Sequence, residues 1–206
     1  MDTAPTRIAF APRGRLSGLL WLVAAALLFA PSSVWANPDI WVKWKLIYVI
    51  ENEKAVGLSL EWRFDQYFSS RIIGENDDDG DGALSDTEVE RLRKQVFEPL
   101  AEHHYFLHLL ADEERQGFQI RDYRAAVEDG TLVYRFKVTF DQAIDYRRDA
   151  MVVSQHDDRV VVDFDFAQSP FLLVEGQLDP GCKFRIGRGR DSLSGHDKTI
   201  TLLCEG

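Results

Sequence analysis

The chain contains very little cysteine, because only Cys182 and Cys204 occur among its 206 residues. Neither has a CxxC partner or a neighbouring histidine pair, so the sequence does not support a zinc site at the cysteines. G-x-S-x-G, HExxH and phosphate-binding glycine motifs are also missing. These absences lead us to expect a protein that is not an enzyme, and they identify no small-molecule substrate.

The sequence also lacks an apolar run of about twenty residues, the length that spans a bilayer. Its longest apolar stretch, Leu16–Ala30, covers only about fifteen residues, follows several arginines and precedes a small-x-small pattern at 34–36. This order is typical of a secretory signal peptide, with an uncleaved anchor as the alternative. We therefore expect a signal peptide at 1–36, cleaved after Ala36, and a single periplasmic or secreted domain at 37–206.

Basic residues are in the minority. There are 24 lysines and arginines against 34 aspartates and glutamates, for a formal net charge of −10. That balance argues against nucleic acid or an anionic membrane surface as a partner and is compatible with cation binding. In an exported protein, an isolated cysteine pair such as Cys182 and Cys204 is typical of a disulfide, which we expect here.

Alternating apolar residues predict strands at both ends of the domain. Residues 40–50 and 56–64 alternate with a period of two and are joined by a short polar link, which predicts a β-hairpin. A second group of strands is predicted from residue 118 onward, the clearest at 160–166 and the last leading into Cys204.

Helical spacing appears only in the middle of the sequence. We expect a short helix at about 65–73 that ends at Gly74, and an amphipathic helix at about 86–98 that ends or kinks at Pro99. A second helical piece is expected to run to about residue 110. These elements predict an α+β fold, with antiparallel strands in an N-terminal hairpin and a C-terminal sheet around a central helical segment.

The acidic stretch 77–88 in this segment matches the EF-hand calcium loop. A hard dication takes six to eight oxygen ligands, and the loop supplies them at alternate positions, with glycine at position 6 and a bidentate glutamate at position 12. The candidate ligands are Asp77, Asp79, Asp81, Ala83 through its carbonyl, Ser85 through a water, and Glu88. Ser85 and Glu88 also form an S-x-x-E capping box that opens the following helix. The interpretation without metal is an acidic turn beside an ordinary capping box.

Two features of this loop predict a structural role for calcium. Gly74 leaves little room for a complete entering helix, and the sequence contains one such loop, whereas calcium sensors usually pair them. We therefore expect weak binding, with a dissociation constant of about 10⁻⁴–10⁻³ M.

Three histidines provide a second candidate site. His103, His104 and His108 fall on the expected second helical piece, and the last two have the i, i+4 spacing that can chelate a transition metal. The alternative is a half-exposed helix with incidental histidines.

Several segments resemble a family of uncharacterised bacterial periplasmic proteins, described as the periplasmic component of an ABC-type transport system and associated with nickel/cobalt permeases. Residues 62–69 are similar to its W-x-F-D-x-x-F-S stretch, the loop 77–88 follows at the same place, and 160–166 and 180–182 resemble its C-terminal strand and cysteine. The family's N-terminal His-Pro-His is replaced here by Asn37-Pro38-Asp39.

The leading hypothesis is therefore an exported, non-enzymatic Ca²⁺-binding protein. The resemblance implies an accessory role in a metal or other transport system, with a membrane permease as the partner. The alternatives are a nickel, cobalt or zinc binder that uses the helix histidines, and an envelope interaction protein in which calcium is purely structural.

Overall fold

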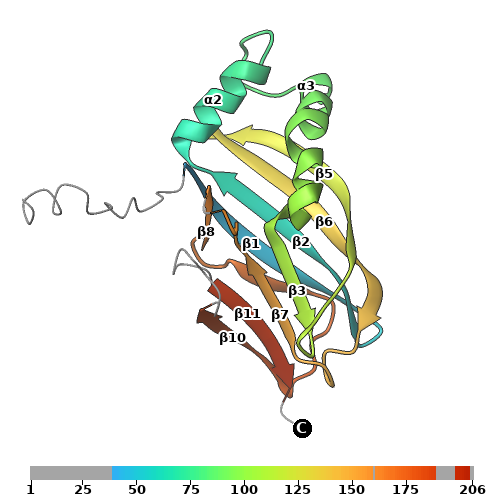
Figure 1. The fold of residues 1–206 in the computed structure, drawn as a ribbon. Helices are drawn as coiled ribbons and strands as arrows, with labels where there is room; N and C mark the ends of the chain where they lie inside the picture. Colours follow the sequence, from blue (N-terminus) through green and yellow to red (C-terminus); the bar gives the residue numbers. More distant parts are fainter. Residues whose placement is uncertain (1–38, 160, 189–197, 205–206) are drawn as a thin grey trace, which may run out of the picture. The chain divides into compact units, whose positions relative to one another are not determined.

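Two β-sheets make up most of the described chain. The computed structural model describes residues 39–159, 161–188 and 198–204 (Figure 1). Strands take 53% of these residues and helices 21%, so the expected α+β fold with a central helical segment is wrong. The expected signal peptide at 1–36 lies outside the described residues.

The larger sheet has six strands in the order β5-β6-β2-β1-β8, and β9 also pairs with β1. The pairs β1–β2, β2–β6 and β5–β6 are antiparallel, whereas β8 and β9 run parallel to β1 along two successive halves of it. The expectation of antiparallel strands alone is therefore wrong at this edge. The strands are β1 (Ile40–Glu51), β2 (Lys54–Phe64), β5 (Phe118–Glu128), β6 (Thr131–Ile144), β8 (Val162–Phe166) and β9 (Leu172–Glu175).

The smaller sheet is antiparallel and has the order β10-β11-β7-β3-β4. Its strands are β10 (Cys182–Arg188), β11 (Lys198–Cys204), β7 (Met151–Gln155), β3 (Leu107–Ala111) and β4 (Glu114–Arg115). Cys182 and Cys204 face each other across β10 and β11 and form a disulfide, as the sequence predicts. Such a bond persists in oxidising compartments, which is consistent with an exported location.

Two helices follow β2 and lie at one end of the larger sheet (Figure 1). Helix α2 (Gln66–Asn76) begins at Asp65, whose carboxylate accepts the N–H of Phe68. It does not end at Gly74 as expected, because the i→i+4 bonds continue to Asp77, whose N–H donates to the Ile73 carbonyl. Helix α3 (Asp86–Leu92) continues into one π-helical turn, η1 (Arg93–Phe97), and a 3₁₀ segment, η2 (Glu98–Phe106).

The expected second helical piece does not reach residue 110. The backbone turns to positive φ at His104, Tyr105 and Phe106, which breaks the helix. From Leu107 the chain is strand β3, whose side chains are buried alternately where it pairs with β7. The expected helical piece is therefore divided between a 3₁₀ segment and a strand of the smaller sheet, which is one physical reason that the predicted class is wrong.

The core lies between the two sheets and is rich in aromatic side chains. Trp62 of β2 is 1% exposed, and its ring contacts Phe97, Phe136 and Phe164, among others. Its Nε1 donates a 2.7 Å hydrogen bond to Oε1 of Gln155, which is fully buried at the end of β7, so one polar bond crosses the core between the sheets.

None of the helices in the described segments is long and apolar enough to cross a membrane.

Candidate metal centres

The first candidate centre is the loop that joins α2 to α3. Helix α2 runs directly into Asp77, and Ser85 is the N-cap of α3. The loop therefore has a helix on each side, so the expectation that Gly74 prevents a complete entering helix is wrong. Gly82 has φ +81°, a left-handed conformation that favours glycine at this sharp turn.

Three aspartates converge inside this loop. Carboxylate oxygens of Asp77, Asp79 and Asp81 all lie within 4.8 Å of one another. The two oxygens of Asp77 accept the N–H groups of Gly80 at 2.8 Å and Gly82 at 2.9 Å, and Asp81 accepts the N–H of Ala83 at 2.8 Å. These bonds wind the backbone around the carboxylates.

Glu88 points back into the loop from the first turn of α3. Its Oε1 accepts the N–H of Asp78 at 2.7 Å, and its Oε2 accepts the N–H and the hydroxyl of Ser85, each at 2.8 Å. These backbone and hydroxyl donors hold the pKa of Glu88 below its usual value. These donors keep the nearly buried glutamate charged, and it joins the beginning of the loop to its end. The capping box that the sequence predicts is present.

The carboxylates of the loop repel one another. The N–H of Asp81 lowers the pKa of Asp79, but the neighbouring carboxylates of Asp81, Asp77 and Glu88 outweigh it, so that the pKa of Asp79 is raised above its usual value. A bound dication would remove this repulsion, because it favours the charged form of every ligand.

Arg91 is a contributor that sequence reasoning missed. Its guanidinium donates to Asp78 at 2.8 Å and to the carbonyl of Asn76 at 2.7 Å, so it ties α3 to the end of α2. Leu84, from the same loop, packs against the core. The loop is therefore fixed to the rest of the protein on both of its sides. Nothing in the local spacing of Arg91 indicates this contact.

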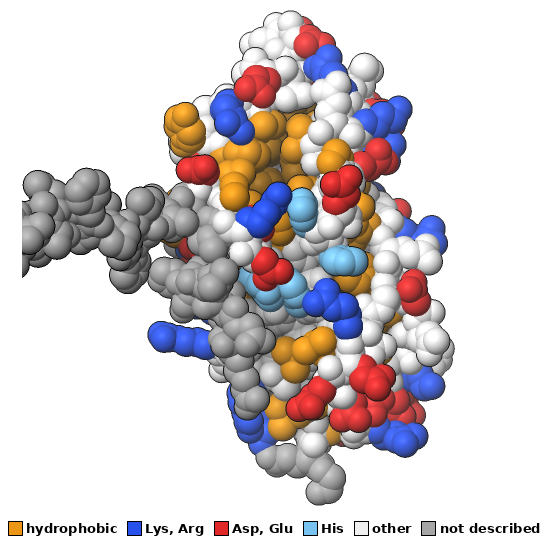
Figure 2. All heavy atoms as spheres, viewed as in Figure 1, with side chains coloured by type: hydrophobic (Ala, Val, Ile, Leu, Met, Phe, Trp, Pro, Cys, Tyr) orange, Lys and Arg blue, Asp and Glu red, His pale blue; other side chains and the backbone are white. Residues whose placement is uncertain are grey.

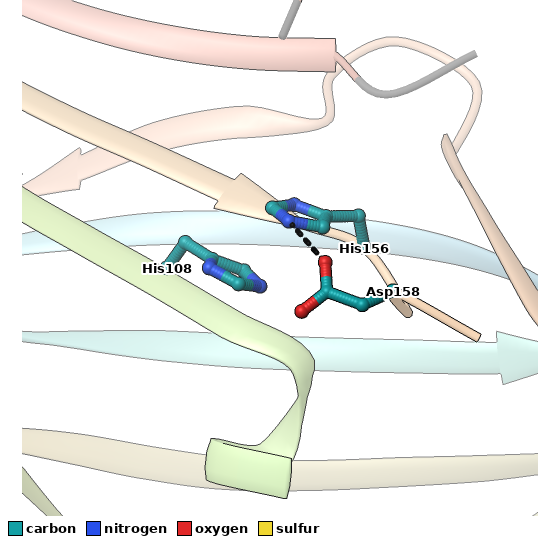
Figure 3. Close-up of side chains that lie close together, drawn as sticks. All are labelled: His108, His156 and Asp158. Atoms are coloured by element: carbon teal, nitrogen blue, oxygen red, sulfur yellow. Dashed lines mark ion pairs between the residues drawn. The ribbon is translucent and has the colours of Figure 1, made fainter. Parts of the chain in front are cut away.

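The second candidate centre contains one of the three predicted histidines. His108 lies on β3 and not on a helix, so the i, i+4 argument that paired it with His104 does not hold. Instead its ring stacks on that of His156, with 3.5 Å between ring centroids and 10° between planes. His156 Nε2 is 3.3 Å from an oxygen of Asp158 (Figure 3).

Strand pairing explains why these residues meet. His108 is paired with Ser154 in the β3–β7 ladder, and His156 lies two residues beyond Ser154, so the two histidines are diagonal neighbours on one face. The N–H of His156 continues the pairing by donating to the carbonyl of Phe106 at 3.1 Å. His108 and His156 are far apart in the sequence, and a single sequence carries no signal that identifies this register.

His103 and His104 lie near this group but do not belong to it. Both lie on η2 and line the same hollow as His108 and His156. The ligand atoms that lie within 4.8 Å of one another come from His108, His156 and Asp158. Burial, with the neighbouring His156 and Arg115 adding to it, lowers the pKa of His108 to about 4. Its imidazole is therefore neutral at physiological pH.

The fold and these two centres define a two-sheet, disulfide-linked protein that presents an all-oxygen loop and a separate histidine–carboxylate group. The chain belongs to the family described as "Protein of unknown function (DUF1007)", whose profile matches residues 22–202. No curated protein matches the chain.

Proposed function

We propose that this protein is an exported, non-enzymatic calcium-binding protein whose loop 77–88 holds one Ca²⁺. The observation that carries the proposal is the convergence of three aspartates and the inward-turned Glu88 within one loop, between two helices. The ligands would be Asp77, Asp79, Asp81, the carbonyl of Ala83, Ser85 through a water, and both oxygens of Glu88. The flanking helices support an EF-hand-like arrangement.

Calcium in this loop would serve stability and not signalling. Leu84 in the loop packs against the core, and Leu92, fully buried in α3, anchors the helix that the loop opens. A dication that neutralises the loop carboxylates would therefore hold α2 and α3 together on the sheet. One loop of this kind fits the weak end of the calcium range, at about 10⁻⁴–10⁻³ M.

The proposal includes a place of action and a partner. We place the protein in the periplasm after cleavage of residues 1–36, and we infer an accessory role beside a membrane permease of a transport system. The support is the disulfide, which fits an oxidising compartment, together with the resemblance given by the sequence. Affinity purification from detergent-solubilised membranes tests the partner, and recovery of the protein without any permease would contradict it.

A thermal-shift titration tests the calcium site. At 10 mM calcium, a dissociation constant of about 10⁻⁴–10⁻³ M stabilises the folded state by about 1.4–2.7 kcal/mol. For a protein of this size, that stabilisation raises the Tm by about 3–10 °C. Magnesium at the same concentration should raise it less, because its octahedral geometry suits a calcium loop poorly.

Two variants identify the ligands in this titration. Glu88→Gln keeps the shape of the side chain but removes its charge, and it should abolish most of the calcium-dependent rise. Asp86→Asn removes one negative charge from the first turn of the same helix, outside the ligand set, and should keep the rise. The proposal fails if calcium leaves the Tm unchanged, or if both variants respond like the unmodified protein.

A further inference from the structure

Several histidines line a hollow that lies outside loop 77–88. It lies where η2, β3 and the segment after β7 meet, and Figure 2 shows histidine side chains gathered in the middle of this face, beside acidic and basic ones. At its centre, His108 and His156 stack on each other and Asp158 reaches toward both rings (Figure 3). Asp158 is 80% exposed, so the group is open to solvent.

We propose that His108, His156 and Asp158 form a second metal site, which takes a first-row transition-metal dication of the Zn²⁺ or Ni²⁺ type and leaves a coordination position open. Imidazole nitrogens with one carboxylate are a donor set that suits these ions. Three protein ligands with a free fourth position form an accessible site, in contrast to the closed four-ligand sites that only support folds.

The distances within the group fit a shared ion. Two ligands that bind one tetrahedral metal at about 2.0–2.1 Å lie about 3.3–3.4 Å apart. His156 Nε2 and the Asp158 oxygen are 3.3 Å apart, which is longer than the usual N–H···O distance of about 2.9–3.0 Å. An ion bound by both atoms would need no change in this separation. The ligand atom of His108 lies within 4.8 Å of the other two. Because the lone pair of an imidazole nitrogen lies in the ring plane, the His108 ring must turn out of its stack on His156 to bind the same ion.

His156 offers one of its two ring nitrogens to a metal. Nδ1 is buried and has no hydrogen-bond partner among the described residues, whereas Nε2 lies beside the Asp158 carboxylate and is the nitrogen that would bind the ion. Stacked imidazole rings do not donate or accept hydrogen bonds between their own nitrogens. Stacking alone therefore does not explain why two polar rings lie at this position.

The rigid support of the site comes from the sheets. The β3–β7 ladder fixes the relative position of His108 and His156. Gln155, directly before His156, is held by Trp62 across the core. Positioning of ligands by packed strands and buried hydrogen bonds is what maintains metal geometry. Arg115 also lines the hollow, and its positive charge disfavours the binding of a cation there. The negative charge of Asp158 offsets this repulsion.

The chemistry of this group separates it from the calcium loop. Calcium binds oxygen ligands in large coordination shells, whereas imidazole nitrogens select transition metals. The histidine site should therefore bind Zn²⁺ or Ni²⁺ when the loop is saturated with calcium, and the loss of either site should leave the other intact.

Calorimetric titration of the purified protein with ZnCl₂ and NiCl₂ in 10 mM calcium tests the proposal. We expect one saturable site for each metal. His156→Ala and Asp158→Asn should each weaken binding by at least about tenfold, because each removes a ligand. Asp158 is exposed, so its substitution keeps the fold and the test remains valid even if a histidine variant unfolds. With Co²⁺ as the probe, the visible d–d absorption of a nitrogen-bound ion should appear in the unmodified protein and be lost in Asp158→Asn.

Two further variants serve as matched controls. A protein carrying His103→Gln and His104→Asn loses two histidines of the same hollow and should keep its zinc affinity. Asparagine is chosen at position 104 because His104 has φ +50°, a left-handed conformation that asparagine tolerates. Glu88→Gln should also keep it. The proposal is overturned if no saturable site appears in excess calcium, if Asp158→Asn and His156→Ala bind as tightly as the unmodified protein, or if only the His103/His104 variant loses binding.

Discussion

The hydrogen bond between Trp62 and Gln155 offers a direct test of how the two sheets are joined. Its 2.7 Å length and the near-complete burial of both side chains make it a polar contact that water cannot replace. The perturbations are Trp62→Phe, Gln155→Met and the two together. Because Gln155 precedes His156, the same bond fixes the end of β7 that carries the proposed metal ligand.

The magnitudes follow from the groups left unpaired. Trp62→Phe leaves the Gln155 oxygen unsatisfied, at about 1–3 kcal/mol, and the lost ring volume adds about 1 kcal/mol. Gln155→Met leaves the indole N–H unsatisfied, but it also removes Nε2 of Gln155, which is buried without a partner in the described structure, so the net cost is about 1 kcal/mol. The coupling energy of the pair should be about 0.5–1.5 kcal/mol.

Equilibrium urea unfolding followed by circular dichroism measures these free energies without relying on the fluorescence of the substituted tryptophan. Trp44→Phe is the matched control. Trp44 is also 1% exposed, but its Nε1 has no hydrogen-bond partner in the described residues. It should therefore destabilise by about 1–3 kcal/mol less than Trp62→Phe. A coupling energy below about 0.3 kcal/mol, within the error of simple additivity, would refute the reasoning.

Two other predictions concern stability. Gly57→Ala in β2 would place a Cβ 2.3 Å from the backbone oxygen of Val138 in β6, so it should lower the free energy of unfolding by about 1–3 kcal/mol. Gly74→Ala in α2 has open space around it and should raise the free energy of unfolding by about 0.5–1 kcal/mol. Equal effects of the two substitutions in a urea titration would contradict this contrast. Arg135 lowers the pKa of Glu128 from 4.5 to about 2, so this carboxylate stabilises the folded state above about pH 4.5 and loses its effect as the pH falls toward 2. Glu128→Gln should therefore destabilise by at most about 1 kcal/mol at pH 7, because the pair is partly exposed, and the difference in Tm should shrink by pH 2–3.

The sequence predicted strands well where one face is buried. The alternation at 40–50 and 56–64 locates β1 and β2 closely, because every second residue there meets the core. It failed at 104–111, where three consecutive residues with positive φ change the chain from helical to extended conformation. No local pattern predicted that turn. The parallel pairing of β8 and β9 with β1 also escaped prediction, because register between distant strands is set by tertiary packing.

The two candidate sites also differ in how far a local sequence pattern predicts them. The candidate calcium ligands all lie within the twelve consecutive residues 77–88, which match a known template, so their convergence can be predicted from spacing alone. His108 comes from β3, whereas His156 and Asp158 come from the segment after β7, and the sequence led us to pair His108 with other histidines. The sequence drew attention to His108, but only the β3–β7 ladder identifies the histidine that it meets.

This difference in origin has a physical consequence for how each site depends on the fold. Loop 77–88 is wound by its own hydrogen bonds, in which the N–H groups of Gly80 and Gly82 donate to Asp77, and it lies between its two flanking helices with Leu84 packed against the core. The histidine group exists only while β3 and β7 are paired, and that pairing is supported by a core that both sheets share. A perturbation that loosens the contact between the sheets should therefore weaken transition-metal binding more than calcium binding, because the position of the histidine group depends on that contact, whereas the loop aspartates are held by hydrogen bonds within the loop.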